Sequence, residues 1–70
     1  MYKYFKQLCK EQNIKSFPIS ATNSEGENVI LMQGVDECGS FYETSTFQEN
    51  GATRINRYYK DGTTTETYER

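Results

Sequence analysis

The sequence predicts an α+β fold in which an N-terminal amphipathic helix packs on a four- to five-stranded, mostly antiparallel β-meander. Two patterns support this prediction. Apolar residues recur at helical spacing near the N-terminus, and Asn50-Gly51 and Asp61-Gly62 stand between β-rich runs in the second half. The 70 residues suffice for one small domain, residues 1–70, with a modest core. Six Tyr and four Phe are expected to supply most of that core.

The N-terminal segment from Tyr2 to Gln12 has the pattern of a helix of about three turns. Lysines share one side of this helix, and the opposite side is apolar. We expect Asn13 to end the helix in the left-handed conformation. The lysine side is interpreted as a solvated face, with a basic docking face as the alternative. The apolar residues are Tyr2, Phe5, Leu8 and Cys9, and the lysines are Lys3, Lys6 and Lys10.

The segment after the helix predicts an edge strand and then an interior strand. Phe17, Ile19 and Ala21 alternate with polar residues or proline, which is typical of a half-buried strand. Pro18 has no N–H to donate, so this strand is expected at an edge of the sheet. A turn over residues 23–27 leads to the continuous apolar run 29–32, which suits an interior strand covered on both faces. We expect this run to form the centre of the core.

The second half predicts three consecutive strands at about residues 40–48, 53–60 and 63–69. Asn-Gly and Asp-Gly are the dipeptides that two-residue type I′ hairpin loops require. If both loops have two residues, Arg57 faces Thr44 on one neighbouring strand and Glu66 on the other, and Arg54 lies opposite Glu69. Opposite charges directly across a strand pair contribute roughly 0.2–1 kcal/mol, which supports this register.

The predicted register leaves open which face of the meander packs against the helix, because each face carries aromatic rings and basic side chains. The face left in solvent is expected to show one of two sets of residues. These sets are Tyr42, Tyr59 and Tyr68 around Arg57, or Phe41, Phe47 and Tyr58 around Arg54 and Lys60.

Charge is strongly segregated along the chain. No Lys or Arg occurs between Phe17 and Asn50, whereas six acidic residues do, and the net charge of the chain is −2. A row of exposed carboxylates can replace nucleic-acid phosphates in a basic groove of a partner protein, and long-range attraction would speed the encounter. The alternative is ordinary solubilising charge. The candidate partner-binding residues are Glu25, Glu27, Asp36, Glu37, Glu43 and Glu49.

Residues 54–60 suggest a different function, because basic and aromatic side chains interleave there. Sheets that bind single-stranded nucleic acid stack bases on such rings and hold phosphates with Arg and Lys. Core rings and cross-strand ion pairs would produce the same pattern, and a net charge of −2 opposes nonspecific binding of nucleic acid. The alternative nucleic-acid-binding residues are Arg54, Arg57, Tyr58, Tyr59 and Lys60.

Several kinds of chemistry are not expected. The chain has no His, which leaves it without a Ser-His or Cys-His pair, and the two cysteines cannot form a structural zinc site. We therefore expect no catalytic residues, no metal and no cofactor. Cys9 is interpreted as a core residue and Cys38 as a loop residue; both are expected to be reduced, with a single disulfide as the alternative. With no signal-peptide run and no membrane-spanning stretch in the sequence, a cytoplasmic protein is expected.

In size, acidity and helix-plus-meander pattern, the chain resembles the small inhibitors that phages and mobile elements use against host defence systems, including anti-CRISPR proteins. No specific motif carries this resemblance. It implies a non-enzymatic protein-binding inhibitor or regulator. The expected partner is a protein with a basic surface, and binding to a membrane is not expected. The last strand is expected to leave one edge free, which makes a homodimer through that edge an additional hypothesis.

Overall fold

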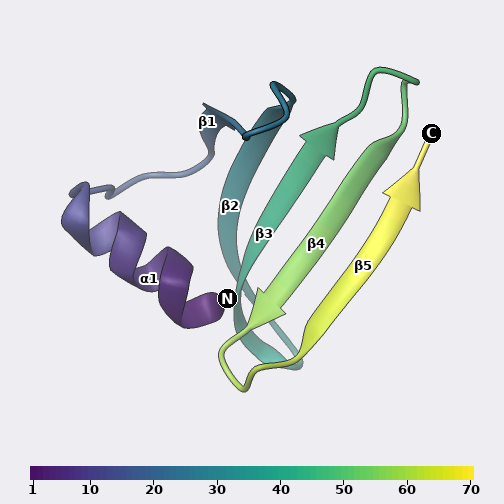
Figure 1. Cartoon of the computed structure of the whole chain (residues 1–70). Helices are drawn as coiled ribbons and strands as arrows, with labels where there is room; N and C mark the ends of the chain where they lie inside the picture. Colours follow the sequence, from purple (N-terminus) through teal and green to yellow (C-terminus); the bar gives the residue numbers. More distant parts are fainter.

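The computed structural model describes residues 1–70 and shows one helix and five strands. They are α1 (Tyr2–Glu11), β1 (Ile19–Thr22), β2 (Asn28–Asp36), β3 (Gly39–Phe47), β4 (Thr53–Tyr59) and β5 (Thr64–Glu69). The strands form one sheet in the order β1-β2-β3-β4-β5, with every neighbouring pair antiparallel (Figure 1). The predicted fold class is therefore confirmed. None of the helical segments has both the length and the apolar character that crossing a lipid bilayer demands.

Helix α1 ends in a Schellman motif, and Asn13 occupies the position that the sequence predicts. Asn13 has φ 54°, its N–H donates to the carbonyl of Lys10, and the N–H of Ile14 donates to the carbonyl of Cys9 over 2.9 Å. These two bonds satisfy carbonyls that the last helical turn would otherwise leave free. Because Ile14 also packs against the core, the motif fixes the direction in which the chain leaves the helix towards β1.

The hairpin loops of the second half each contain three residues, so the prediction of two-residue loops is wrong. In the first loop the N–H of Gln48 donates to the carbonyl of Ala52, and the N–H of Gly51 donates back to the carbonyl of Gln48. Gly51 has φ 86°, and Gly62 has φ 95° in the second loop, which repeats the pattern. This is a type I turn followed by a left-handed glycine, a loop that also favours Asn-Gly and Asp-Gly.

The additional loop residue shifts the register by one position across both hairpins. Arg57 faces Glu43 and Thr65, instead of the expected Thr44 and Glu66. A one-residue shift moves side chains to the other face of the sheet, so each of the two expected aromatic sets is divided between the faces. The helix side carries Tyr42, Arg54, Tyr58 and Tyr68, and the open side carries Phe41, Phe47, Arg57 and Tyr59.

The core lies between α1 and one face of the sheet. Phe5 and Cys9 of the helix pack on Leu31 and Tyr42, and the ring of Tyr42 also lies 5.0 Å from that of Tyr2. Aromatic pairs at such distances add roughly 0.5–1.5 kcal/mol beyond the area they bury. Both cysteines are free, with Cys9 in this core and Cys38 exposed in the β2–β3 turn.

The apolar run of β2 lies inside the sheet but is not covered on both faces, which corrects the expectation for residues 29–32. Val29 and Leu31 point to the helix side, whereas Ile30 and Met32 point to the open side. Only Leu31 of the four is buried, and Met32 is exposed. Figure 1 shows the reason: the single helix lies on one side of the sheet, and no second layer covers the other.

The open face has its own packed contact around Gly34. The ring of Phe41, the cross-strand partner of Gly34, lies over this glycine, and the ring of Tyr59 lies 5.5 Å from that of Phe41. Both rings are buried although no helix covers them. The absence of a side chain at position 34 therefore makes the space that Phe41 occupies.

Gly34→Ala is expected to destabilise the protein by about 1–3 kcal/mol, because the new Cβ would stand 2.7 Å from Cζ of Phe41. In a Phe41→Leu background the same substitution should cost less, since the end of the ring is gone. Urea unfolding of the wild type, both single variants and the double variant measures this coupling. Equal costs of Gly34→Ala in the two backgrounds would contradict the proposed contact.

Candidate functional site

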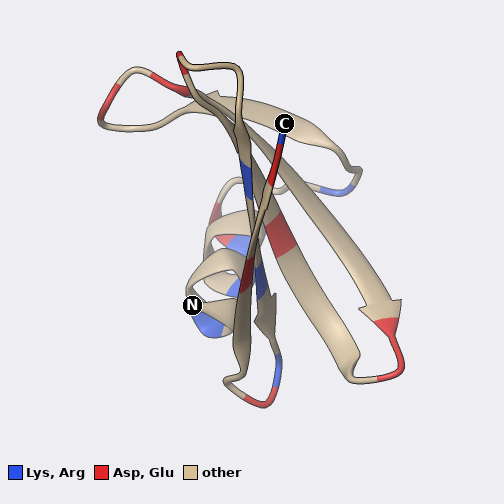
Figure 2. Cartoon of the chain, turned by 90° about the vertical axis from the view of Figure 1, so that its right-hand side faces the viewer, with Lys and Arg blue, Asp and Glu red and all other residues tan.

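Three of the six predicted partner-binding residues gather at one end of the sheet. Glu25 and Glu27 lie in the β1–β2 turn, and Glu49 lies in the β3–β4 turn. Because β2 and β3 are paired, the two turns lie side by side and surround a hollow of about 390 Å³ together with Gln48 and Asn50. We call Glu25, Glu27 and Glu49 the acidic end (Figure 2).

Asn23 fixes the conformation of the turn that carries two of these carboxylates. Its Oδ1 accepts hydrogen bonds from the backbone N–H groups of Glu25 and Glu27, each over 3.0 Å. Its Nδ2 donates to Oε1 of Glu27, and this hydrogen bond lowers the pKa of the Glu27 carboxyl from its ordinary value. Glu27 therefore stays ionised at neutral pH, in a position that the turn itself determines.

The other three predicted residues do not belong to the acidic end. Asp36 and Glu37 lie at the far end of β2 and in the β2–β3 turn, and the nine residues of β2 span about 30 Å. Glu43 lies within β3, on the open face. The six acidic residues thus occupy both ends and the middle of the sheet, and they do not form one continuous surface (Figure 2).

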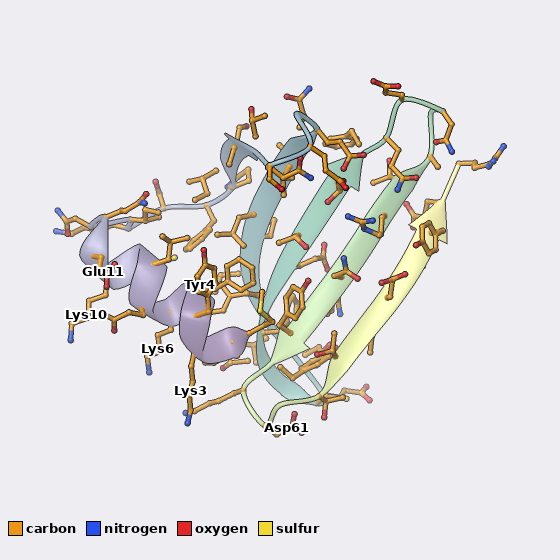
Figure 3. All side chains as sticks on the ribbon, viewed as in Figure 1. Lys3, Tyr4, Lys6, Lys10, Glu11 and Asp61 are labelled. Atoms are coloured by element: carbon orange, nitrogen blue, oxygen red, sulfur yellow. The ribbon has the colours of Figure 1, made fainter.

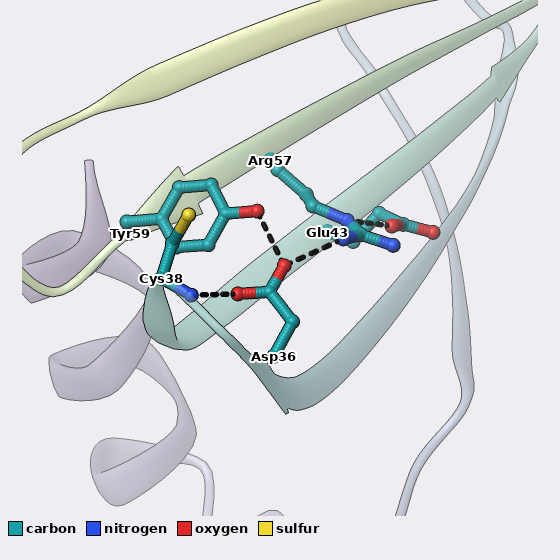
Figure 4. Close-up of polar contacts among 5 residues, drawn as sticks. All are labelled: Asp36, Cys38, Glu43, Arg57 and Tyr59. Atoms are coloured by element: carbon teal, nitrogen blue, oxygen red, sulfur yellow. Dashed lines mark hydrogen bonds and ion pairs between the residues drawn. The ribbon is translucent and has the colours of Figure 1, made fainter.

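Asp36 and Glu43 take part in a network of polar contacts around Arg57 (Figure 4). Nη1 of Arg57 donates to Oδ2 of Asp36 over 2.9 Å, and Nε donates to Oε2 of Glu43 over 2.6 Å. The hydroxyl of Tyr59 donates to the same Asp36 oxygen over 2.6 Å. The Arg57 guanidinium also lies 4.2 Å from the centre of the Phe41 ring. The end of β2 passes behind β4 in Figure 1, and the close-up in Figure 4 shows Asp36 of this end beside Arg57 and Tyr59 of β4.

The directions of the pKa shifts in this network favour the ionised forms of Asp36 and Arg57. The hydrogen bond from Tyr59 lowers the pKa of Asp36, with further contributions from the Cys38 N–H and from Arg57. The contacts with Tyr59 and Glu43 raise the pKa of Arg57 further above its already high value. Two carboxylates and the guanidinium are therefore occupied with one another. This arrangement leaves Asp36 and Glu43 less suited to a partner than the acidic end.

The candidate nucleic-acid-binding residues do not share one surface. Arg57 and Tyr59 lie on the open face inside the network just described, and Arg54 and Tyr58 lie on the helix side. The Tyr58 ring is 5.3 Å from that of Phe5, against the helix. Lys60 follows β4 in the β4–β5 turn. Aromatic and basic residues that follow one another along β4 therefore lie on opposite faces of the sheet.

A groove between α1 and the helix side of the sheet was missed by the sequence analysis. It has a volume of about 330 Å³, and Tyr4, Phe5 and Leu8 form its helix wall. The sheet forms its floor, with polar, apolar and charged strand residues: Val29, Thr44, Thr46, Arg54, Asn56 and Tyr58. The signal in the sequence is Tyr4: it lies four residues before Leu8 and so extends the apolar side of the helix beyond the part that packs on the sheet. Tyr4 is 58% exposed. We call this cavity the helix groove.

Comparison with known proteins supplies no function for the chain. No family model matches it, and no curated protein and no solved structure is significantly similar to it. A fold alone does not define an activity, because one architecture carries many unrelated functions.

Acid should weaken the fold through Asp36. A carboxyl whose pKa is lower in the folded than in the unfolded state stabilises the fold above its unfolded pKa of about 3.9, and this contribution disappears as pH falls through the folded value. Asp36→Asn is expected to lower stability at pH 6 and to reduce the loss of stability below about pH 4. Urea unfolding measured at several values from about pH 2.5 to about pH 6 detects both effects.

Glu37→Gln is the matched control, because Glu37 is exposed in the adjacent turn and loses the same charge. It should leave the pH dependence of unfolding as in the wild type. An unchanged acid response in Asp36→Asn would show that the contacts of Asp36 contribute nothing to folding.

Proposed function

We propose that the chain is a small non-enzymatic protein-binding module, an inhibitor or regulator, that uses the acidic end to contact a basic surface of a partner protein. The observation that supports this proposal most directly is the gathering of three carboxylates from two turns around one hollow. None of the three takes part in an ion pair, whereas both ion pairs of the structure use Asp36, Glu43 and Arg57. Their charge is available to a partner.

Electrostatics favours an encounter at this end of the molecule. Lys6 and Lys10 point outward from α1, and Lys3 lies at the end of the helix beside the β4–β5 turn (Figure 3). Positive charge on the outer side of the helix and unpaired negative charge at the acidic end give the molecule a directional field. Such a field turns the acidic end towards a basic surface and raises the association rate, with an effect that salt reduces.

In this proposal the carboxylates occupy a site on the partner that otherwise binds nucleic-acid phosphates. The resemblance to small phage and mobile-element inhibitors, of the anti-CRISPR kind, supports this choice of partner. The interaction would then take place in the cytoplasm. Nucleic-acid binding through Arg54, Arg57, Tyr58, Tyr59 and Lys60 has less support, because Arg57 is held between two carboxylates and Tyr58 faces the helix.

Glu25→Lys/Glu49→Lys is expected to abolish capture of the partner in a pull-down from lysate. The double substitution reverses two charges of the acidic end and leaves the hydrogen bonds between Asn23 and Glu27 in place. Capture by the wild type should survive nuclease and decrease at high salt. Bound proteins are identified by mass spectrometry, and circular dichroism checks that the variant is folded.

Glu11→Lys/Glu37→Lys is the matched control, since it makes the same change in net charge at exposed residues away from the acidic end. It should retain capture. Equal capture by both double variants, or loss in both, would overturn the proposal. Capture by the wild type that depends on intact nucleic acid would transfer the assignment to residues 54–60.

Strand β5 offers a second route to a partner. All six of its residues are exposed, and no strand pairs with its outer edge. It has no proline, whereas the strand at the other edge is shorter and follows Pro18. We therefore also propose a homodimer through β5. Because such an interface is small and weak, sedimentation velocity should show a dimer that forms with rising concentration at roughly tens of micromolar. A monomer throughout that range would exclude the dimer.

A further inference from the structure

The helix groove has the composition of a binding site for an apolar side chain. Tyr4, Phe5 and Leu8 form one wall, and Val29 contributes apolar surface to the floor. Figure 3 places Tyr4 on the side of α1 opposite Lys3, Lys6 and Lys10. With a volume of about 330 Å³, the groove lies at the small end of the range for ligand sites, about 300–1,000 Å³. It therefore suits a single side chain with its peptide group.

Two buried polar side chains on the floor of the groove have no partner in the protein. Asn56 is only 8% exposed and Thr46 only 4%. The side-chain hydrogen bonds within strands β2, β3 and β4 involve neither Asn56 nor Thr46. Every polar side-chain atom that is fully shielded from solvent has a hydrogen-bond partner. Because the Asn56 amide and the Thr46 hydroxyl have none, they must be accessible, and both residues line the groove. Buried polar groups are nearly always paired, so these two are suited to hydrogen bonds with an occupant.

The groove and the acidic end adjoin at Asn23. The residue lines the groove, and its side chain also donates to the carboxylate of Glu27. A chain segment that places an apolar side chain beside Thr46 and Asn56 therefore passes Asn23 on its way to Glu25 and Glu27. The part of that segment that reaches the acidic end must be positive to complement the carboxylates there, whereas the part inside the groove, beside Arg54, must carry no positive charge.

We propose that the helix groove binds an apolar side chain, aromatic or aliphatic, from a basic segment of the partner protein whose Lys or Arg residues contact the acidic end. This inference rests on the proposed function and adds the anchor residue to it. Burying one large apolar side chain contributes more to affinity than one exposed ion pair. The charges thus direct the encounter, and the anchor in the groove holds the complex.

Two lysine-rich synthetic peptides that differ only in one central residue, phenylalanine or serine, test the inference. Fluorescence anisotropy measures their affinities for the wild-type protein. The phenylalanine peptide should bind about tenfold more tightly or better, as expected for burial of one aromatic side chain. In NMR spectra this peptide, and not the serine peptide, should shift the side-chain amide signals of Asn56 and the methyl signals of Val29.

Ala21→Trp should remove the preference for phenylalanine, because Ala21 is exposed and lines the groove, which the larger ring would fill. Ser20→Trp is the matched control: it places the same ring one residue earlier on β1, on the opposite face of the sheet, and should keep the preference. Tyr4→Ala removes part of the groove wall at an exposed position and provides a second variant if Ala21→Trp does not fold. It should reduce the preference.

The variants distinguish failure of this inference from failure of the proposed function. Equal affinity of the wild type for both peptides, or a preference that survives Ala21→Trp or Tyr4→Ala, would overturn the anchor alone. Binding of neither peptide would overturn the anchor together with the contact at the acidic end. Glu25→Lys/Glu49→Lys should weaken the binding of both peptides. If this double variant binds both peptides as tightly as the wild type does, the acidic end is not the contact surface, even if the groove binds the phenylalanine side chain.

Discussion

The register of the two C-terminal hairpins determines the rest of the structure. In each loop a left-handed glycine closes a three-residue turn, and the preceding Asn50 or Asp61 accepts a hydrogen bond from the N–H two residues later, over 2.9 Å in both cases. These loops place Glu43 opposite Arg57 and Tyr42 opposite Tyr58. A shift of one residue would put Arg57 on the helix side and remove it from Glu43, so the core and the ion pairs depend on the same register.

The two faces of the sheet are stabilised by different interactions because only one of them is covered. On the helix side, aromatic and aliphatic side chains exclude water in the usual two-layer arrangement. On the open side, Phe41 packs over Gly34, and Arg57 is held by Asp36 and Glu43. No side chain is less than 2% exposed, which is expected for a chain of this size. The open-side network therefore supplements a small core.

The fold could be predicted from the sequence to the level of its class and its elements, but not to the level of the complete strand order or of the register. Asn50-Gly51 locates the turn, because a glycine with positive φ is needed there. It does not fix the loop length, since two- and three-residue loops both favour the same dipeptide. The predicted register is wrong by only one residue along the chain. Because side chains alternate between the two faces of a sheet, this error places side chains on the wrong face.

The site was predictable only in part, for a related reason. Sequence shows that residues 17–50 contain six acidic residues and no basic ones, but not which carboxylates are neutralised by residues elsewhere. Arg57 lies 14 positions from Glu43 and 21 from Asp36, and only the folded sheet brings them together. The helix groove depends in the same way on how α1 lies over the strands, which no local pattern in residues 2–11 determines.

The distribution of neutralised and free charge explains why an end of the sheet, and not a face, is the better contact surface. A partner that docked on the open face would meet a guanidinium already bound to two carboxylates, and would have to replace those contacts to gain its own. At the acidic end the carboxylates are solvated and unpaired, and the turn that Asn23 holds keeps Glu27 in place before any partner arrives. Association there costs little reorganisation, and the adjoining helix groove supplies the apolar contact that charge alone does not provide.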